Sequence, residues 1–193
     1  MARKLRLAIL LGLSLRASTA FGATGKEPSP WAPYEFLIGE WDVSSRAGGP
    51  PVAAARFRWG PNRAYIWYAG SLMLDGVERP HFEGLLVWNG VRRNLDMLVS
   101  MDLEHGLVQE QGVVRVEPDG TVVREITATY AAGTQPIGRP KVGSEGATAH
   151  FRQTFRPSGP DRVLTEVLRQ TDRGWTATFP GSDRLVMTRK TKA

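Results

Sequence analysis

The side chains best suited to acid–base or metal chemistry in this sequence are three widely spaced histidines, His81, His105 and His150. The chain has no cysteine, so disulfides, thiolate metal sites and a cysteine nucleophile are excluded. A metal site would need Asp or Glu partners from other strands, and only His81 and Glu83 are expected to share a strand face. A solvated polar face is the simpler interpretation of that pair, so we predict no metal site.

Motifs that carry established catalytic mechanisms are absent from the sequence. It has no nucleophile elbow, no phosphate-binding glycine loop, no His-Glu-x-x-His zinc motif and no EF-hand spacing. The sequence therefore assigns no catalytic residue and implies no cofactor. An isomerase or cyclase that uses a shaped pocket and one acid or base is the least supported alternative, with His81 and Glu83 as its first candidates.

Aromatic side chains on the expected strands point to binding rather than catalysis. Aromatic rings with polar tips give a ligand pocket both contact area and orientation. We therefore expect a small hydrophobic or amphipathic ligand in the interior of the fold. The candidate ligand-binding residues are Phe57, Tyr65, Trp67, Trp88, Met97 and Arg124. The alternative is that these rings fill the interior, which would leave a structural or protein-interaction barrel that works through its outer surface.

Arg124 is the candidate that most needs a partner. On the expected strand 121–131, the more apolar parity holds Arg124 together with Val122, Ile126, Ala128 and Tyr130. A guanidinium that faces a barrel interior requires an anion, either a ligand carboxylate or an internal glutamate. A one-residue bulge would instead turn this side chain to solvent.

Strands must position these side chains, because period-two patterns run through most of the chain. A short helical turn over 33–37 is followed by an uninterrupted series of strand segments. They cover residues 40–47, 52–59, 63–73, 81–88, 91–101, 107–117, 121–131, 147–156, 162–170, 175–179 and 184–190. The longest irregular stretch is 132–146, and no helical pattern interrupts the series.

Turn signals join these strands into hairpins. Asn89-Gly90 predicts a two-residue type I′ turn, and Pro118-Asp119-Gly120 predicts a second hairpin. Sequential hairpins with one apolar face must cover that face, and closing the sheet on itself does so while removing its edges. We predict an all-β fold, a single antiparallel up-and-down barrel of about eight to ten strands with a short N-terminal helical turn. A two-sheet sandwich is the alternative.

The segment Phe36 to Trp41 (FLIGEW) resembles the opening of calycin-type barrels, where a short turn leads into Gly-x-Trp on the first strand. The resemblance to lipocalins, fatty-acid-binding proteins and nitrobindins implies that Trp41 is a plug over one end of the barrel. Residues 34–190 are similar to a bacterial group of exported calycin-like proteins of unknown function. Two features depart from the relatives: His150 lacks the surroundings of the nitrobindin haem ligand, and only residues 47–51 replace the helix pair of fatty-acid-binding proteins.

The first twenty residues have the three parts of a secretory signal peptide. Basic residues precede the apolar run Leu7 to Leu15, and small residues lead to a cleavage site after Ala20. We predict a signal peptide over 1–20, a flexible tether over 21–32 and a barrel domain over 33–193. The protein is then exported, to the periplasm or the extracellular space.

Removing the predicted signal peptide changes the charge of the chain. The first twenty residues hold four basic and no acidic side chains, so the net charge falls from +6 to +2. The remaining basic residues are scattered among acidic ones, which excludes nucleic acid as a partner. No later apolar stretch reaches membrane-spanning length, so we expect a soluble mature protein without permanent membrane insertion. The sequence specifies no oligomeric state.

Overall fold

A computed structural model describes residues 29–103, 106–136 and 141–191. The elements are η1 (Ala32–Leu37), β1 (Gly39–Ser44), β2 (Pro51–Trp59), η2 (Pro61–Arg63), β3 (Tyr65–Leu74), β4 (Val77–Asn89), β5 (Asn94–Leu103), β6 (Gly106–Val116), β7 (Val122–Tyr130), β8 (Ala147–Pro157), β9 (Arg162–Thr171), β10 (Gly174–Ala177) and β11 (Leu185–Arg189). Each strand lies within a few residues of a segment that the period-two pattern predicts, and the predicted helical turn is the 3-10 segment η1.

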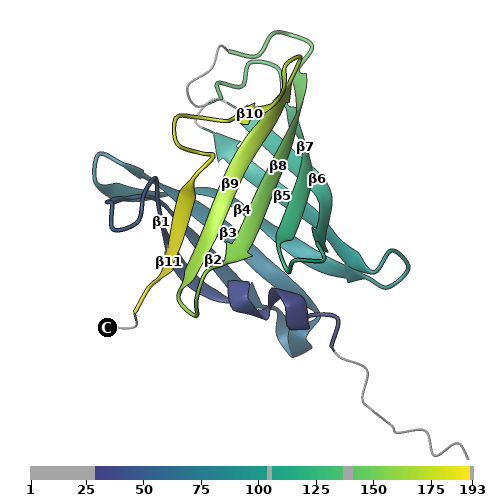
Figure 1. Ribbon diagram of the computed structural model, residues 1–193. Helices are drawn as coiled ribbons and strands as arrows, with labels where there is room; N and C mark the ends of the chain where they lie inside the picture. The colour runs from purple at the N-terminus through teal and green to yellow at the C-terminus, as the bar shows by residue number, and fades with distance from the viewer. Residues whose placement is uncertain (1–28, 104–105, 137–140, 192–193) are drawn as a thin grey trace, which may run out of the picture.

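Ten strands close into one antiparallel barrel (Figure 1). Neighbouring strands follow one another from β1 to β9, and β11 then pairs with both β9 and β1 to complete the ring. This closure confirms the predicted all-β barrel and excludes the two-sheet sandwich. A closed ring leaves no long unpaired edge, which is how a meander of hairpins satisfies its backbone groups.

The last place in the barrel wall is shared by two short strands. β11 pairs with the first part of β9, and β10 pairs with the last part. Between them, the Val167 amide donates to the Ser182 carbonyl at 2.6 Å, and the Thr178 amide donates to the Val167 carbonyl at 3.1 Å. The Ser182 side chain is fully buried and its hydroxyl donates to the Val167 carbonyl at 2.8 Å. The loop between β10 and β11, residues 178–184, is therefore fixed to the barrel wall at the point on β9 where strand pairing is interrupted.

Two tight turns use positive backbone angles that glycine favours. The predicted Pro-Asp-Gly hairpin is confirmed, because Gly120 has φ +81° and its amide donates to the Glu117 carbonyl at 2.9 Å. A two-residue turn between β3 and β4 is formed by Asp75 and Gly76, with φ values of +53° and +77°. Two positive φ angles are the signature of a type I′ turn, and Asp-Gly is one of its preferred sequences.

The predicted two-residue turn at Asn89-Gly90 is wrong. Asn89 pairs with Asn94, so the loop between β4 and β5 contains four residues. The Asn89 side-chain oxygen accepts hydrogen bonds from the amides of Val91 and Arg92 at 3.1 and 3.0 Å. This capping by asparagine winds the chain into a helical turn that Arg93 closes with φ +54°.

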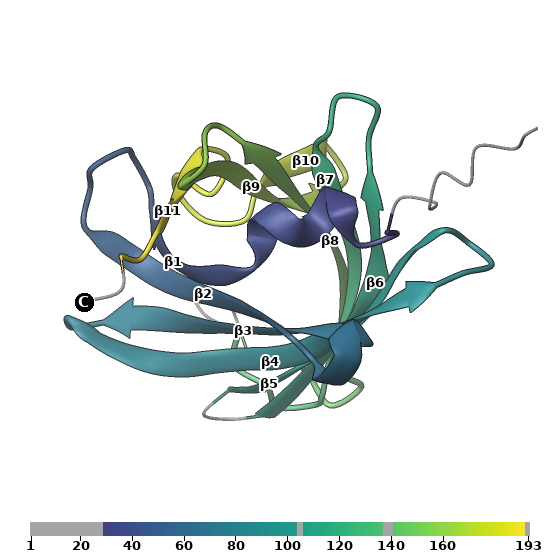
Figure 2. The same cartoon turned by 90° about the horizontal axis from the view of Figure 1, so that it is seen from below.

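One end of the barrel is closed by η1, which lies across it (Figure 2). Tyr34 and Leu37 of η1 are buried, and the Tyr34 hydroxyl donates to the Val114 carbonyl at 3.4 Å. Trp41 on β1 is 1% exposed, and its indole N–H donates to the Leu37 carbonyl at 2.8 Å. The ring thus fills the barrel end and also ties the turn to the wall.

Arg189, the last residue of β11, holds this end together. Its guanidinium carbon lies 4.2 Å from the centre of the Trp41 ring, and its Nη1 donates to the Ile38 carbonyl at 2.7 Å. Its Nη2 donates to the Phe36 carbonyl at 3.1 Å. Gly39 makes room for this side chain, since a Cβ there would lie 2.3 Å from the Arg189 Nη1. The guanidinium therefore satisfies carbonyls that a short 3-10 segment leaves without partners.

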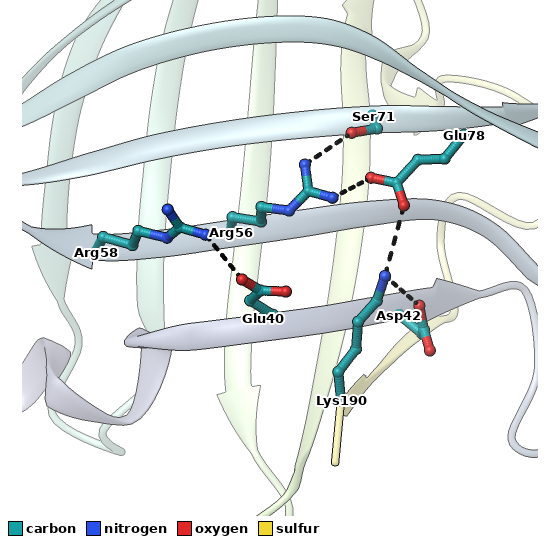
Figure 3. Close-up of polar contacts among 7 residues, drawn as sticks. All are labelled: Glu40, Asp42, Arg56, Arg58, Ser71, Glu78 and Lys190. Atoms are coloured by element: carbon teal, nitrogen blue, oxygen red, sulfur yellow. Dashed lines mark hydrogen bonds and ion pairs between the residues drawn. The ribbon is translucent and has the colours of Figure 1, made fainter. Parts of the chain in front are cut away.

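An ion-pair network crosses the outer face where the first and last strands meet (Figure 3). Lys190, which follows β11, contacts Asp42 of β1 at 3.2 Å and Glu78 of β4 at 3.6 Å. Arg56 of β2 also pairs with Glu78. The Ser71 hydroxyl, together with the Arg56 and Lys190 charges, lowers the pKa of Glu78. Because the groups are partly solvated, each pair contributes at most about 1 kcal/mol.

The predicted signal peptide, residues 1–20, lies outside the described residues, and so do residues 21–28 of the predicted tether. Trp31 and Ala32 belong to the folded part. Trp31 is buried and meets Trp59 edge-to-face, with ring centres 5.4 Å apart. Among the described residues, no helix has the length and apolar character needed to cross a membrane.

Candidate ligand-binding cavity

A cavity of about 510 Å³ occupies the half of the barrel away from η1. The position follows from β2, because its last residue, Trp59, contacts Trp31 beside η1, while Val52 and Ala53 near its start line the cavity. Three lining residues, Val52, Leu74 and Phe179, are exposed. They mark the mouth, which faces away from the closed end.

Small side chains leave this space open. Ala53 and Ala55 occupy inward positions of β2, and both line the cavity. The position of Gly70 on β3, which pairs with Ala55, is covered by the Phe82 ring, and that ring also lines the cavity. Further along the same two strands, the inward positions carry the bulky Phe57 and Ile66, which are buried in the core. The barrel wall therefore changes from small to large side chains along its length, and the void lies where they are small.

Apolar side chains form most of the cavity wall, and they come from strands all around the barrel. They include Val43, Phe82, Val108, Ile126, Phe151 and Phe155. A site of this kind offers dispersion contacts and removes apolar ligand surface from water.

Arg124 on β7 places a permanent cation in the wall of this apolar space. It is 7% exposed, and its guanidinium carbon lies 4.9 Å from the centre of the Tyr68 ring. β7 keeps a continuous register with β6 and β8, so no bulge turns Arg124 outward. Within the described part of the chain, its buried Nε has no hydrogen-bond partner. Burial raises the pKa of the Tyr68 phenol, against the opposing effect of the Arg124 charge.

Glu110 on β6 places a carboxyl group in the wall of the same cavity. It is 9% exposed, and burial raises its pKa while the Arg124 charge opposes that rise. The two residues stand apart along the strands, because Glu110 pairs with Ala128 and Arg124 pairs with Val114. Among the described residues, no ion pair within 4.0 Å joins Glu110 to Arg124.

Gln153 and Thr165 add neutral polar groups to the wall. The Gln153 side-chain amide donates to the Thr165 hydroxyl at 3.3 Å, and both residues are buried. Gln153 lies directly opposite Arg124 in the pairing of β7 with β8. The described part of the wall thus offers the Arg124 guanidinium, the Glu110 carboxyl group and the Gln153 amide, which suits orientation of a polar head group.

His81 enters the cavity wall through a bulge in β4. Gly70 pairs with Phe82 and Ser71 pairs with Pro80, so His81 is the extra residue. Burial lowers the pKa of its imidazole. The expectation that His81 and Glu83 share one face is wrong, because Glu83 is exposed on the outer face and accepts the Trp67 indole N–H at 2.6 Å.

Two of the predicted ligand-binding residues, Tyr65 and Trp67, lie on the outer face of β3. The inward positions of this strand are instead Ile66 and Tyr68, both buried. Trp67 lies under the exposed guanidinium of Arg58, 5.6 Å from its ring centre. Both parities of β3 carry large apolar side chains, so alternation could not distinguish its two faces.

Three other predicted residues lie inside the barrel but outside the cavity. Phe57 is buried and stacks on Tyr68 with ring centres 4.5 Å apart, which fixes a ring that lines the cavity. Met97 is buried in the core, and the partly buried Trp88 packs against that core. These side chains fill the closed half. Of the six predicted ligand-binding residues, the structure places Arg124 in the cavity wall.

The sequence interpretation missed Glu110 and Gln153. Both were detectable as polar residues on an inward parity: Glu110 follows Val108 in the alternation of β6, and Gln153 lies between Phe151 and Phe155 on β8.

In the described residues, no cluster of three His, Asp or Glu side chains could hold a metal ion. A scan against protein-family models finds no match to this chain, and a search of curated proteins finds no significant match. The closed antiparallel barrel is consistent with a calycin-like fold.

Proposed function

We propose that this protein binds a small hydrophobic or amphipathic molecule in the cavity of its barrel. The observation that carries this proposal is an apolar void of about 510 Å³ that contains two buried groups of opposite charge, Arg124 and Glu110. Small-molecule sites occupy roughly 300–1,000 Å³ and combine apolar walls with few polar groups. A filled-core interaction barrel would have no such void.

The shape of the cavity supports ligand exchange with the surroundings. Its mouth is bordered by the exposed side chains of Val52, Leu74 and Phe179, so an apolar molecule meets apolar surface as it enters. The opposite end is sealed by η1 and Trp41. A ligand therefore enters and leaves by one end.

Export and family membership are part of the same proposal. We infer that residues 1–20 are cleaved as a signal peptide and that the mature barrel works outside the cytoplasm as a member of an exported calycin-like group. The support is the basic, apolar and small-residue order of the leader. Mass spectrometry of protein from the periplasmic fraction should give an N-terminus at Phe21. Full-length protein confined to the cytoplasm would contradict export.

A fluorescent apolar probe tests the binding proposal. N-phenyl-1-naphthylamine should bind the purified protein saturably, with one site per chain and enhanced emission. Ala53→Trp fills the cavity from its inner wall and should weaken probe binding at least about tenfold. The matched control is Thr129→Trp, which adds a ring of the same kind at an exposed position of β7.

The control should bind the probe with the affinity of the wild type. Absence of saturable binding to the folded wild type would overturn the proposal. Equal affinity of Ala53→Trp and the wild type would also overturn it, because the probe would then occupy another surface.

A further inference from the structure

Arg124 and Glu110 form an unusual pair because both are more than nine-tenths buried in one cavity and no ion pair joins them. Buried ions normally touch an opposite charge, since the loss of hydration is otherwise uncompensated. Here the register separates them, as Arg124 lies opposite Val114 and Glu110 lies opposite Ala128. Arg124 instead contacts the Tyr68 ring, and its Nε has no hydrogen-bond partner among the described residues.

The described lining residues offer groups of both signs, and burial disfavours the charged form of Glu110 as well as that of His81. Among the described residues that line the cavity, Arg124 is the permanent cation and Glu110 is the sole carboxylate. The buried His81 imidazole favours its neutral form, because burial lowers its pKa. Gln153 and Thr165 hydrogen bond to each other and add no charge. A ligand head with a full charge of either sign would attract one of the two ions and repel the other.

We propose that the ligand carries a neutral polar head that bridges the two ions, with a hydrogen-bond acceptor on Arg124 and a donor toward Glu110. A primary or secondary amide, or a carbonyl next to a hydroxyl, has this chemistry. The acceptor would take the free Nε–H of Arg124, which has no partner among the described residues. The apolar remainder of the ligand would extend along the wall toward the mouth. This inference rests on the proposed binding function and defines the class of its ligand.

Three probes with the same decyl chain test the inference by displacing N-phenyl-1-naphthylamine at about pH 7.5, where decanoate and decylamine are fully charged. Decanamide should displace the fluorescent probe from the wild type at concentrations at least about fivefold lower than either charged probe. This ranking requires no variant, so it does not depend on how any substitution affects folding.

Two substitutions then reverse the ranking in opposite directions. Glu110→Gln leaves Arg124 as the charge of the cavity and should make decanoate the strongest competitor. Arg124→Met leaves Glu110 and should favour decylammonium. The double variant Arg124→Met/Glu110→Gln should bind all three probes with similar affinity, and circular dichroism would verify that each variant is folded.

The possible failures have different meanings. If N-phenyl-1-naphthylamine does not bind the folded wild type, the proposed function itself fails. If it binds, and the three decyl probes displace it equally from the wild type and all variants, the head-group inference is overturned and the binding function stands. A wild type that prefers decanoate would also overturn the inference, because the site would then be an anion site.

Discussion

The two halves of this barrel use the same strands for opposite purposes. In the closed half, the polar groups of the Trp41 indole and the Arg189 guanidinium find backbone carbonyl partners, and large side chains fill the interior. In the open half, the small inward side chains of Ala53 and Ala55 border a void, and the buried Arg124 and Glu110 form no ion pair with each other.

This contrast separates stability from function within one domain. An interior that is filled, and whose polar groups have hydrogen-bond partners, stabilises the fold. Buried ions beside a void instead cost free energy that packing elsewhere must offset. Substitutions in the two halves should therefore change stability in different directions.

The largest effect is expected at the closed end. Trp41→Ala removes a fully buried ring and its hydrogen bond to the Leu37 carbonyl, so the free energy of unfolding should fall by about 3–5 kcal/mol. Urea denaturation followed by circular dichroism measures this change. Trp175→Ala is the control, since Trp175 is 41% exposed on β10 and its loss should cost under about 0.5 kcal/mol. Similar losses in the two variants would contradict the role assigned to Trp41.

The next effect concerns the clamp across the closed end. Arg189→Met keeps the aliphatic length but removes the donors to the carbonyls of Ile38 and Phe36, so unfolding should become easier by about 2 kcal/mol. Arg173→Met, at an exposed turn position, is the matched control. If Arg189→Met is as stable as this control, the guanidinium does not fix η1 to the barrel.

The open half should respond in the opposite direction. The double variant Arg124→Met/Glu110→Gln removes both buried charges, and the free energy of unfolding should stay level or rise by about 1 kcal/mol. The same variant should lose at least about tenfold in affinity for decanamide. A stability loss as large as that of Arg189→Met would show that these charges hold the fold together.

The smallest effect is a pH dependence that belongs to Glu110. Burial raises its pKa above 4.5, so the folded state holds this proton more tightly than the unfolded state. Its stability contribution is then complete below pH 4.5 and is lost as the pH rises through the folded pKa. Outer carboxylates such as Glu78 and Glu125, whose pKa values are lowered, act in the opposite direction.

Comparison with Glu110→Gln isolates the single group from those outer carboxylates. The stability difference between the wild type and this variant should decline as the pH rises above 4.5. A difference that grows with pH would mean that Glu110 is stabilised as an ion, in a direct pair that the structure does not contain.

Local patterns predict the strands of this fold well because most strands obey a period of two. Alternation also places Arg124 inward, because β7 pairs with both β6 and β8 without a bulge. The rule fails on β3, where Trp67 and Tyr68 give both faces an aromatic side chain, and Trp67 lies on the outer face with its indole N–H donated to Glu83. It also fails at His81, where a bulge shifts the alternation by one residue.

The cavity itself could not be predicted from local patterns. Its wall combines side chains from many strands, and strand register, rather than any one sequence segment, sets where Ala53 and Ala55 lie relative to Phe82. The separation of Glu110 from Arg124 is likewise a property of register. Residue types can suggest that a barrel binds a ligand. Predicting a void requires knowing which side chains lie next to one another inside the barrel.

Amide chemical shifts in an NMR titration with decanamide test the central claim most directly, because they show where in the barrel the ligand lies. The largest shifts should fall on Ala55, Glu110 and Arg124 of the open half, with saturation at one molecule per chain. Amides of Leu37 and Trp41 at the closed end should not move. Shifts concentrated at the closed end or on the outer face, with none in the cavity wall, would contradict this account.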